Sequence, residues 1–94
     1  MSYEAVMQYA APNPTHMPLL DAMWELHNTN AHHEFTARMV MQRGGWRPNL
    51  TRFVTLGILV KAGGGTQGGG GQVSYRLADP PGFERALRAL GRLR

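Results

Sequence analysis

Seven glycines within residues 61–72 separate two short segments that have the composition of β-strands. Ile58-Leu59-Val60 lies before them and is apolar, whereas Val73-Ser74-Tyr75-Arg76-Leu77 lies after them and alternates apolar with polar residues. Such alternation is typical of a strand with one buried face. Glycine-rich segments rarely form helices or strands, because glycine loses much backbone freedom when it is ordered. The pattern therefore predicts a β-hairpin with a mobile tip at residues 62–72.

Four helices are predicted around this hairpin from the spacing of apolar residues. They cover residues 17–27, 31–42 and 48–56 before the hairpin, and residues 82–93 after it. Pro18 is acceptable in a first helical turn, and Asn30 is a suitable cap for the second helix. Gly57 can supply the left-handed residue that ends the third helix. The apolar residues of the last helix share one face, which predicts a closing amphipathic helix.

Residues 1–14 are predicted to form an arm outside the core. Tyr3, Val6, Met7 and Tyr9 are spaced as one face of a short helix, but the helical pattern stops at Pro12-Asn13-Pro14. A chain of 94 residues lies within the range of one compact domain, because chains divide into several cores only when they are much longer. Residues 15–94 are therefore expected to form that domain.

The composition excludes several classes of protein. The absence of cysteine excludes a disulfide scaffold and a zinc module with thiolate ligands. The first residues do not combine a basic segment with a long apolar one, and the most apolar run, residues 53–60, is far too short to span a bilayer. We therefore expect a soluble protein that is not exported, with a reducing cytoplasm as its location.

Charge is distributed unevenly along the chain. Residues 1–34 contain four acidic residues and no Lys or Arg, residues 35–78 contain six basic residues and no acid, and residues 79–94 contain two acids and four arginines. These segments carry −4, +6 and +2, which gives the net charge of +4. A segregated positive surface attracts polyanions, and arginine, which supplies nine of the ten basic residues, suits phosphate and guanine. The alternative is that each arginine is merely solvated, or that the acidic third screens the basic one.

The predicted element order and the segment Asn49-Leu50-Thr51-Arg52-Phe53-Val54-Thr55-Leu56-Gly57-Ile58-Leu59-Val60 resemble the winged helix-turn-helix superfamily of bacterial, archaeal and phage regulators. The resemblance covers residues 17–78. It implies an α+β fold, a small winged helix-turn-helix with three helices, a two-stranded hairpin as the wing and a C-terminal helix. In this fold the third helix runs through Leu-Gly into the first wing strand. The segment 43–48 departs from the pattern, since it is longer than a tight helix-turn-helix turn.

The resemblance also implies where DNA would be bound. The third helix of this fold enters the major groove with its N-terminal residues facing the base edges, and the wing lies along the backbone. By this resemblance, the residues expected to contact DNA are Arg43, Arg47, Asn49, Thr51 and Arg52 around the third helix, and Lys61 and Arg76 on the wing. The alternative for Asn49 and Thr51 is a capping or solvated role. In a DNA-binding protein the arginines at 43, 47, 52 and 76 must converge on one face.

Two functions are therefore expected as alternatives. The first is a DNA-binding transcriptional regulator that acts as a homodimer, because one short recognition helix covers too few base pairs for selectivity. The N-terminal arm and the C-terminal helix are the candidate dimer elements. The second is a winged-helix module of a phage or host accessory factor that binds protein instead of DNA. The sparse polar surface of the third helix favours this alternative.

Catalysis, metals and cofactors are not expected. The glycine tract is not a phosphate-binding P-loop, because no Gly-Lys-Ser/Thr follows it and no helix begins there. Ser74 and the histidines lie on separate predicted elements, and no nucleophile-elbow or paired-acid motif is present. His32 and His33, if helical, point about 100° apart, which disfavours their joint coordination of one ion together with His27 or Glu34.

Overall fold

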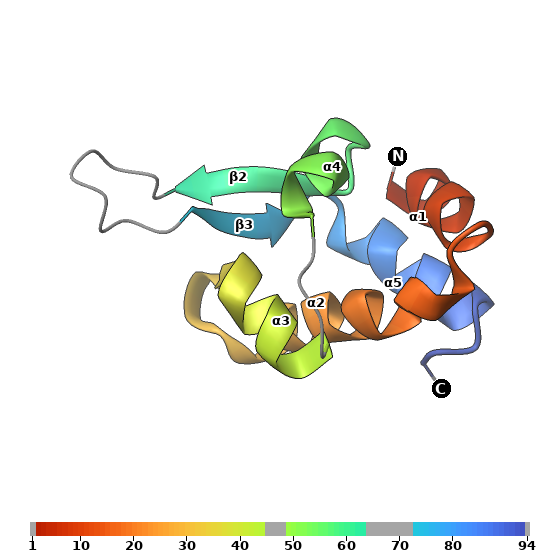
Figure 1. Cartoon of the computed structure of the whole chain (residues 1–94), viewed down its shortest axis with the longest axis horizontal. Helices are drawn as coiled ribbons and strands as arrows, with labels where there is room; N and C mark the ends of the chain where they lie inside the picture. Colours follow the sequence, from red (N-terminus) through yellow and green to blue (C-terminus); the bar gives the residue numbers. More distant parts are fainter. Residues whose placement is uncertain (1, 45–48, 64–72, 94) are drawn as a thin grey trace.

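A computed structural model describes residues 2–44, 49–63 and 73–93. These residues form a small compact α+β structure with five α-helices, two short 3-10 helices and one antiparallel sheet. The elements in chain order are α1 (Ser2–Ala10), η1 (Pro14–His16), α2 (Met17–Thr29), η2 (Ala31–His33), β1 (Phe35–Thr36), α3 (Ala37–Gly44), α4 (Leu50–Thr55), β2 (Leu59–Gly63), β3 (Ser74–Leu77) and α5 (Pro80–Ala89). The hairpin β2–β3 extends from one end of the molecule, and α1 and α5 lie towards the other (Figure 1).

The sheet has three strands, where the sequence predicted two. The order is β1-β3-β2, so β3 is central and pairs with Phe35 and Thr36 on its second edge. Phe35 lies opposite Tyr75, and both side chains are buried. A strand of two residues forms here because burial of these cross-strand aromatic residues stabilises the pairing. The strand pairing of the predicted hairpin is confirmed, with β2 and β3 antiparallel and a register shift between Lys61 and Gly63. Most of its predicted mobile tip, residues 64–72, lies outside the described residues.

The predicted helix at residues 31–42 is wrong in its first half. His32 and His33 have positive φ angles of 58° and 60°, which interrupt a right-handed helix. The chain then passes through β1, and α3 begins only at Ala37. The Thr36 hydroxyl accepts a hydrogen bond from the Met39 N–H at 3.3 Å, so Thr36, not Asn30, caps the helix.

The N-terminal residues belong to the core, in contrast to the predicted arm. Residues 2–10 are helical, as their spacing indicated, but α1 packs against α5. Val6 is fully buried, and Tyr9 contacts Phe53 of α4 with ring centroids 4.8 Å apart. At the surface of this packed pair, the Arg85 guanidinium lies 4.6 Å from the centre of the Tyr3 ring. The apolar faces of α1 and α5 are therefore used within one chain.

The remaining helix boundaries follow from capping residues. The first predicted helix begins at Met17 as expected and continues two residues further, to Thr29. The C-terminal helix begins at Pro80 instead of residue 82, because prolines suit a first helical turn and the Asp79 side chain accepts from the Gly82 N–H. It ends at Ala89, before Gly91 with φ +77°.

The core lies around α2, between the sheet and the α1–α5 pair. Leu20 and Met23 of α2 are fully buried, together with one phenylalanine each from β1, α4 and α5. The helix α2 runs through the middle of the molecule, with α3 on one side (Figure 1). Among the helices that the structure describes, none is both long enough and apolar enough to cross a bilayer.

Candidate nucleic-acid interface

Ion pairs divide the basic residues into two groups. Arg43 pairs with Glu25, Arg88 pairs with Glu84, and Arg92 pairs with Asp21. Apart from Arg85, whose guanidinium lies over the Tyr3 ring, four exposed basic residues in the described parts of the chain have no carboxylate within ion-pair distance. They are Arg38 on α3, Arg52 on α4, Lys61 on β2 and Arg76 on β3. All four come from the acid-free segment 35–78, so their charge is not neutralised locally.

Among the described residues, the acids other than the exposed Glu4 form ion pairs, helix caps or hydrogen bonds with other groups. Asp21 and Glu25, both on α2, form ion pairs, and Asp79 caps α5 through the Gly82 N–H. The Ser74 hydroxyl donates a hydrogen bond of 3.2 Å to Glu34. The acidic N-terminal third therefore screens Arg43, on the α2 side of α3, whereas the four residues named above keep their charge exposed.

Helix α4 presents a narrow polar face. Leu50 and Phe53 point into the core, while Thr51, Arg52 and Thr55 are exposed. The Thr55 hydroxyl donates to the Thr51 carbonyl oxygen at 3.2 Å, which ties it to its own helix. Within α4, the Thr51 and Arg52 side chains are thus the ones best placed to contact a ligand.

Asn49 has a structural role at the start of this helix. Its side-chain oxygen accepts the Arg52 N–H at 3.3 Å, which makes Asn49 the N-cap of α4. The predicted helix at 48–56 is correspondingly shorter, from Leu50 to Thr55. The capping alternative for Asn49 is thus what the structure describes, and it occupies the oxygen that would accept from an adenine amino group.

The junction after α4 directs the chain into the hairpin. Gly57 has φ +83°, and its N–H donates to the Val54 carbonyl oxygen at 3.0 Å. The Ile58 N–H then donates to the Phe53 carbonyl oxygen at 2.9 Å, and β2 begins at Leu59. A side chain at position 57 would disfavour this left-handed conformation. Glycine here fixes the direction of β2 relative to α4.

The hairpin carries cations on both of its faces. In the register of β2 and β3, Val60 pairs with Arg76 and Lys61 pairs with Tyr75. Paired residues of an antiparallel ladder point to the same face, and adjacent residues point to opposite faces. Arg76 therefore shares the exposed face with Val60, while Lys61 lies on the face that buries Tyr75.

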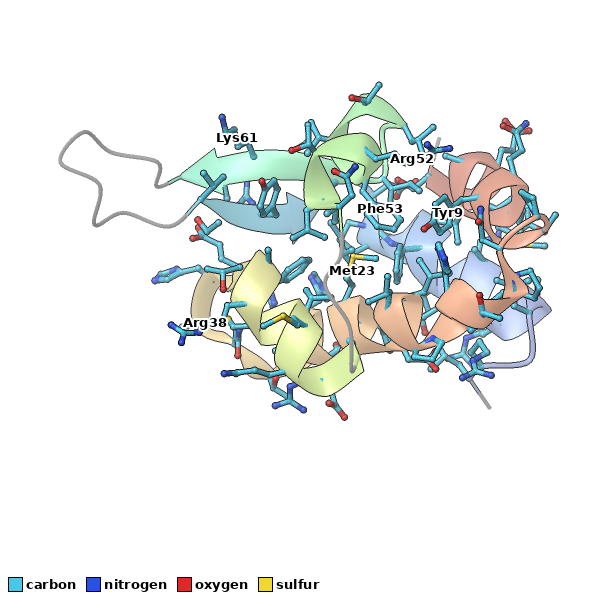
Figure 2. All side chains as sticks on the ribbon, viewed as in Figure 1. Tyr9, Met23, Arg38, Arg52, Phe53 and Lys61 are labelled. Carbon is cyan, nitrogen blue, oxygen red and sulfur yellow. The ribbon has the colours of Figure 1, made fainter. Side chains whose placement is uncertain are left out.

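The predicted site residues are brought together only in part. Figure 2 shows Arg52 and Lys61 along the same edge of the molecule, from α4 and β2. Arg43 does not join them, since it pairs with Glu25 of α2. Arg47 lies outside the described residues, so its convergence with the other arginines is not described either.

Arg38 was not among the predicted site residues. It is exposed near the start of α3 and lines a hollow of about 230 Å³ with Thr36, Ala37, Val73 and Tyr75. In Figure 2 it lies on the opposite side of the sheet from Lys61. The sequence does place Arg38 in the acid-free segment 35–78, which could have marked it as a candidate. The strand β1, which brings it beside β3, was not predicted.

The histidines form a ring stack. His33 stacks on His27 with centroids 4.4 Å apart, and its Nδ1–H donates to the His27 carbonyl oxygen at 2.7 Å. Burial lowers the pKa of His27, and the neighbouring His33 lowers this pKa further. The His27 Nδ1 atom is buried without a hydrogen-bond partner. Across the described residues, no three His, Cys, Asp or Glu side chains are placed to hold a metal ion together.

Comparison with known protein families, with curated proteins and with solved structures finds no match to this chain.

Proposed function

We propose that this chain is a winged helix-turn-helix protein that binds double-stranded DNA. The order α2, α3, α4, β2, β3 agrees with the arrangement that the sequence resemblance implies. The passage from α4 through Gly57 directly into β2 supports the same assignment. In the proposed fold the hairpin β2–β3 is the wing, and β1 attaches it to the helices through β3.

The observation that carries the proposal is the group of exposed cations without carboxylate partners on α4, β2 and β3. Arg52, Lys61 and Arg76 supply this charge, while the described acids of the chain pair, cap or hydrogen-bond elsewhere, except for the exposed Glu4 on α1. Phosphate contacts from such residues supply most of the affinity of non-specific DNA binding. Arginine and lysine in these positions therefore suit a polyanionic backbone.

The proposed contacts divide between helix and wing. Thr51 and Arg52 lie on the exposed face of α4, which would enter the major groove. The wing presents Lys61 and Arg76 on opposite faces. A hairpin with cations on both faces can contact the phosphates on either side of a groove. Arg47 remains a predicted contact, and Arg43 is left out because Glu25 engages it.

We further propose a regulatory role in the cytoplasm as a homodimer, without a catalytic function or a cofactor. The short helix α4 covers few base pairs, so selectivity requires two half-sites. The sequence suggested residues 1–14 and the C-terminal helix as dimer elements. In the structure these two segments bury their apolar faces against each other within one chain. The homodimer therefore needs another surface.

A module that binds protein is the second candidate. It is favoured by the small polar face of α4 and by four apolar side chains that are 38–40% exposed. These are Met39 and Met41 on α3, Leu56 after α4 and Val60 on β2. Single exposed apolar residues are normal on a protein surface, and these four come from three parts of the fold. DNA binding therefore stays the preferred function.

Fluorescence anisotropy with a labelled duplex tests the proposal. Arg52→Ala and Arg76→Ala are expected to weaken binding and to reduce the salt slope by about one unit each, because each removes one phosphate contact. Arg43→Ala removes the same charge from the α2 side of α3 and is the matched control. Equal losses in all three variants would indicate unspecific charge attraction, and unchanged affinity in Arg52→Ala and Arg76→Ala would favour the protein-binding module.

A further inference from the structure

A small cavity lies between the N-terminal helix and α4, next to the proposed DNA-contacting face. Its volume is about 150 Å³, and its walls include Ala5, Tyr9 and Pro12 on one side and Arg52 and Leu56 on the other. Figure 2 shows Tyr9 and Arg52 in the region where α1 and α4 approach each other. The cavity therefore exists only because α1 is part of the core.

One end of the cavity is polar and positively charged. Arg52 lines it and has no carboxylate within ion-pair distance in the described segments of the chain. Burial raises the pKa of the Tyr9 hydroxyl, and the positive charge of Arg52 opposes this increase, so the two groups interact electrostatically. The Tyr9 hydroxyl is held by a hydrogen bond with His16 Nδ1. The polar end thus offers one cation beside a fixed phenol.

Two amide side chains line the cavity, Asn13 and Gln8, and they differ in whether they can bind a ligand. Asn13 Nδ2 donates to the Tyr9 carbonyl oxygen at 2.8 Å, which fixes the turn after α1. Gln8 is exposed and lines the same cavity. An amide N–H from Gln8 can therefore support an anion that is bound by Arg52.

Size and polarity define the ligand. Drug-sized ligands need roughly 300–1,000 Å³, which is more than this cavity offers. A volume of about 150 Å³ has room for the body of a single six-carbon ring. The apolar walls from Ala5, Pro12 and Leu56 suit such a body, and the single guanidinium suits one negative charge better than the two of a phosphate monoester.

We propose that this cavity binds a small monocarboxylate, with its apolar body between α1 and α4 and its carboxylate on Arg52. The regulatory consequence rests on the proposed function, in which Arg52 contacts DNA. A bound carboxylate neutralises Arg52 and holds it towards α1, so the occupied protein has one phosphate contact fewer. The ligand therefore lowers the affinity for DNA.

Isothermal titration of the full chain with cyclohexanecarboxylate tests the site without any DNA. Cyclohexylmethanol, which has the same ring and no charge, is the matched ligand control. We expect millimolar binding of the acid and about tenfold weaker binding of the alcohol, because a charge-assisted hydrogen bond is lost. Arg52→Gln should also weaken binding about tenfold, whereas Arg38→Gln, a change at another exposed cation without a carboxylate partner, should not.

A second variant probes the apolar part of the cavity. Ala5→Leu extends a side chain into the space while Arg52 keeps its charge, so it should abolish binding of the acid. Circular dichroism shows whether each variant is folded. Failure of the wild-type protein to bind the acid at tens of millimolar, or equal binding by wild type and Arg52→Gln, would overturn the proposed site.

Anisotropy of labelled duplex DNA with and without the acid separates this proposal from the proposed function. Binding of the acid by a protein that does not bind DNA would uphold the cavity and refute the DNA function. DNA binding without binding of the acid would do the reverse. Where both bind, an unchanged DNA affinity in the presence of the acid would refute the regulatory coupling.

Discussion

Replacement of Val6 by alanine tests whether the N-terminal helix is part of the core. Val6 is fully buried between α1 and its neighbours, so the substitution removes two buried carbons and leaves a cavity. The transfer term is about 0.8 kcal/mol per carbon, and the cavity adds to it, which gives about 2–3 kcal/mol. The higher helix propensity of alanine returns a few tenths of a kcal/mol. We therefore expect a net loss of about 2 kcal/mol.

This loss is readily measured. For a chain of this size, each kcal/mol shifts Tm by roughly 4–8 °C, so Val6→Ala should melt about 8–16 °C lower. Urea unfolding followed by circular dichroism should give a lower midpoint with an unchanged m-value. Glu4→Ala, at an exposed position of the same helix, is the control and should stay within about 0.5 kcal/mol of wild type. An effect of Val6→Ala as small as that of Glu4→Ala would restore the arm that the sequence predicted.

Three further predictions concern local features. Asn49→Ala should destabilise the fold by about 1 kcal/mol in urea unfolding, and Asn49→Asp should recover most of this, because both Asn and Asp cap a helix; equal losses would refute the cap. His27 has a lowered pKa in the folded state, so that state binds fewer protons than the unfolded one. Stability should therefore be full above pH about 6.5 and fall as the pH drops through the folded-state pKa, and His27→Phe should flatten this dependence in urea midpoints at neutral and mildly acidic pH. Gly57→Ala should cost about 1 kcal/mol through the left-handed backbone alone, since nothing lies within 4 Å of an added Cβ; thermal melting without a shift would contradict this.

Local signals predicted much of the fold correctly. The start of α2 at Met17, the hairpin around the glycine tract and the role of Gly57 depend on residues close in sequence. Each involves a turn or a cap whose energy is set within a few residues. The coarse α+β class followed from these elements together.

Long-range contacts account for what was missed. The strand β1 has only two residues and exists because Phe35 lies opposite Tyr75, forty residues later in the chain. The place of α1 in the core depends on α5, at the other end of the sequence. Neither partner is indicated by periodicity, because periodicity describes one element at a time.

The candidate site shows the same division. The excess of positive charge in residues 35–78 was visible in the sequence, but the pairing of Arg43 with Glu25 was not, since 18 residues separate them. Thr51 and Arg52 lie on the exposed face of α4, whereas the Asn49 oxygen serves its own helix. Charge totals therefore indicated which segment is basic, and only the fold shows which arginines keep their charge exposed.

The most direct test of DNA binding is the salt dependence of the unmodified protein. Anisotropy of a labelled duplex of mixed sequence is titrated with the protein at several salt concentrations. Contacts from Arg52, Lys61 and Arg76 to three phosphates predict a plot of log K against log salt with a slope of about −2.7 or steeper. Absence of binding at low salt, or a slope near zero, would contradict the proposal that α4 and the hairpin β2–β3 bind the DNA backbone.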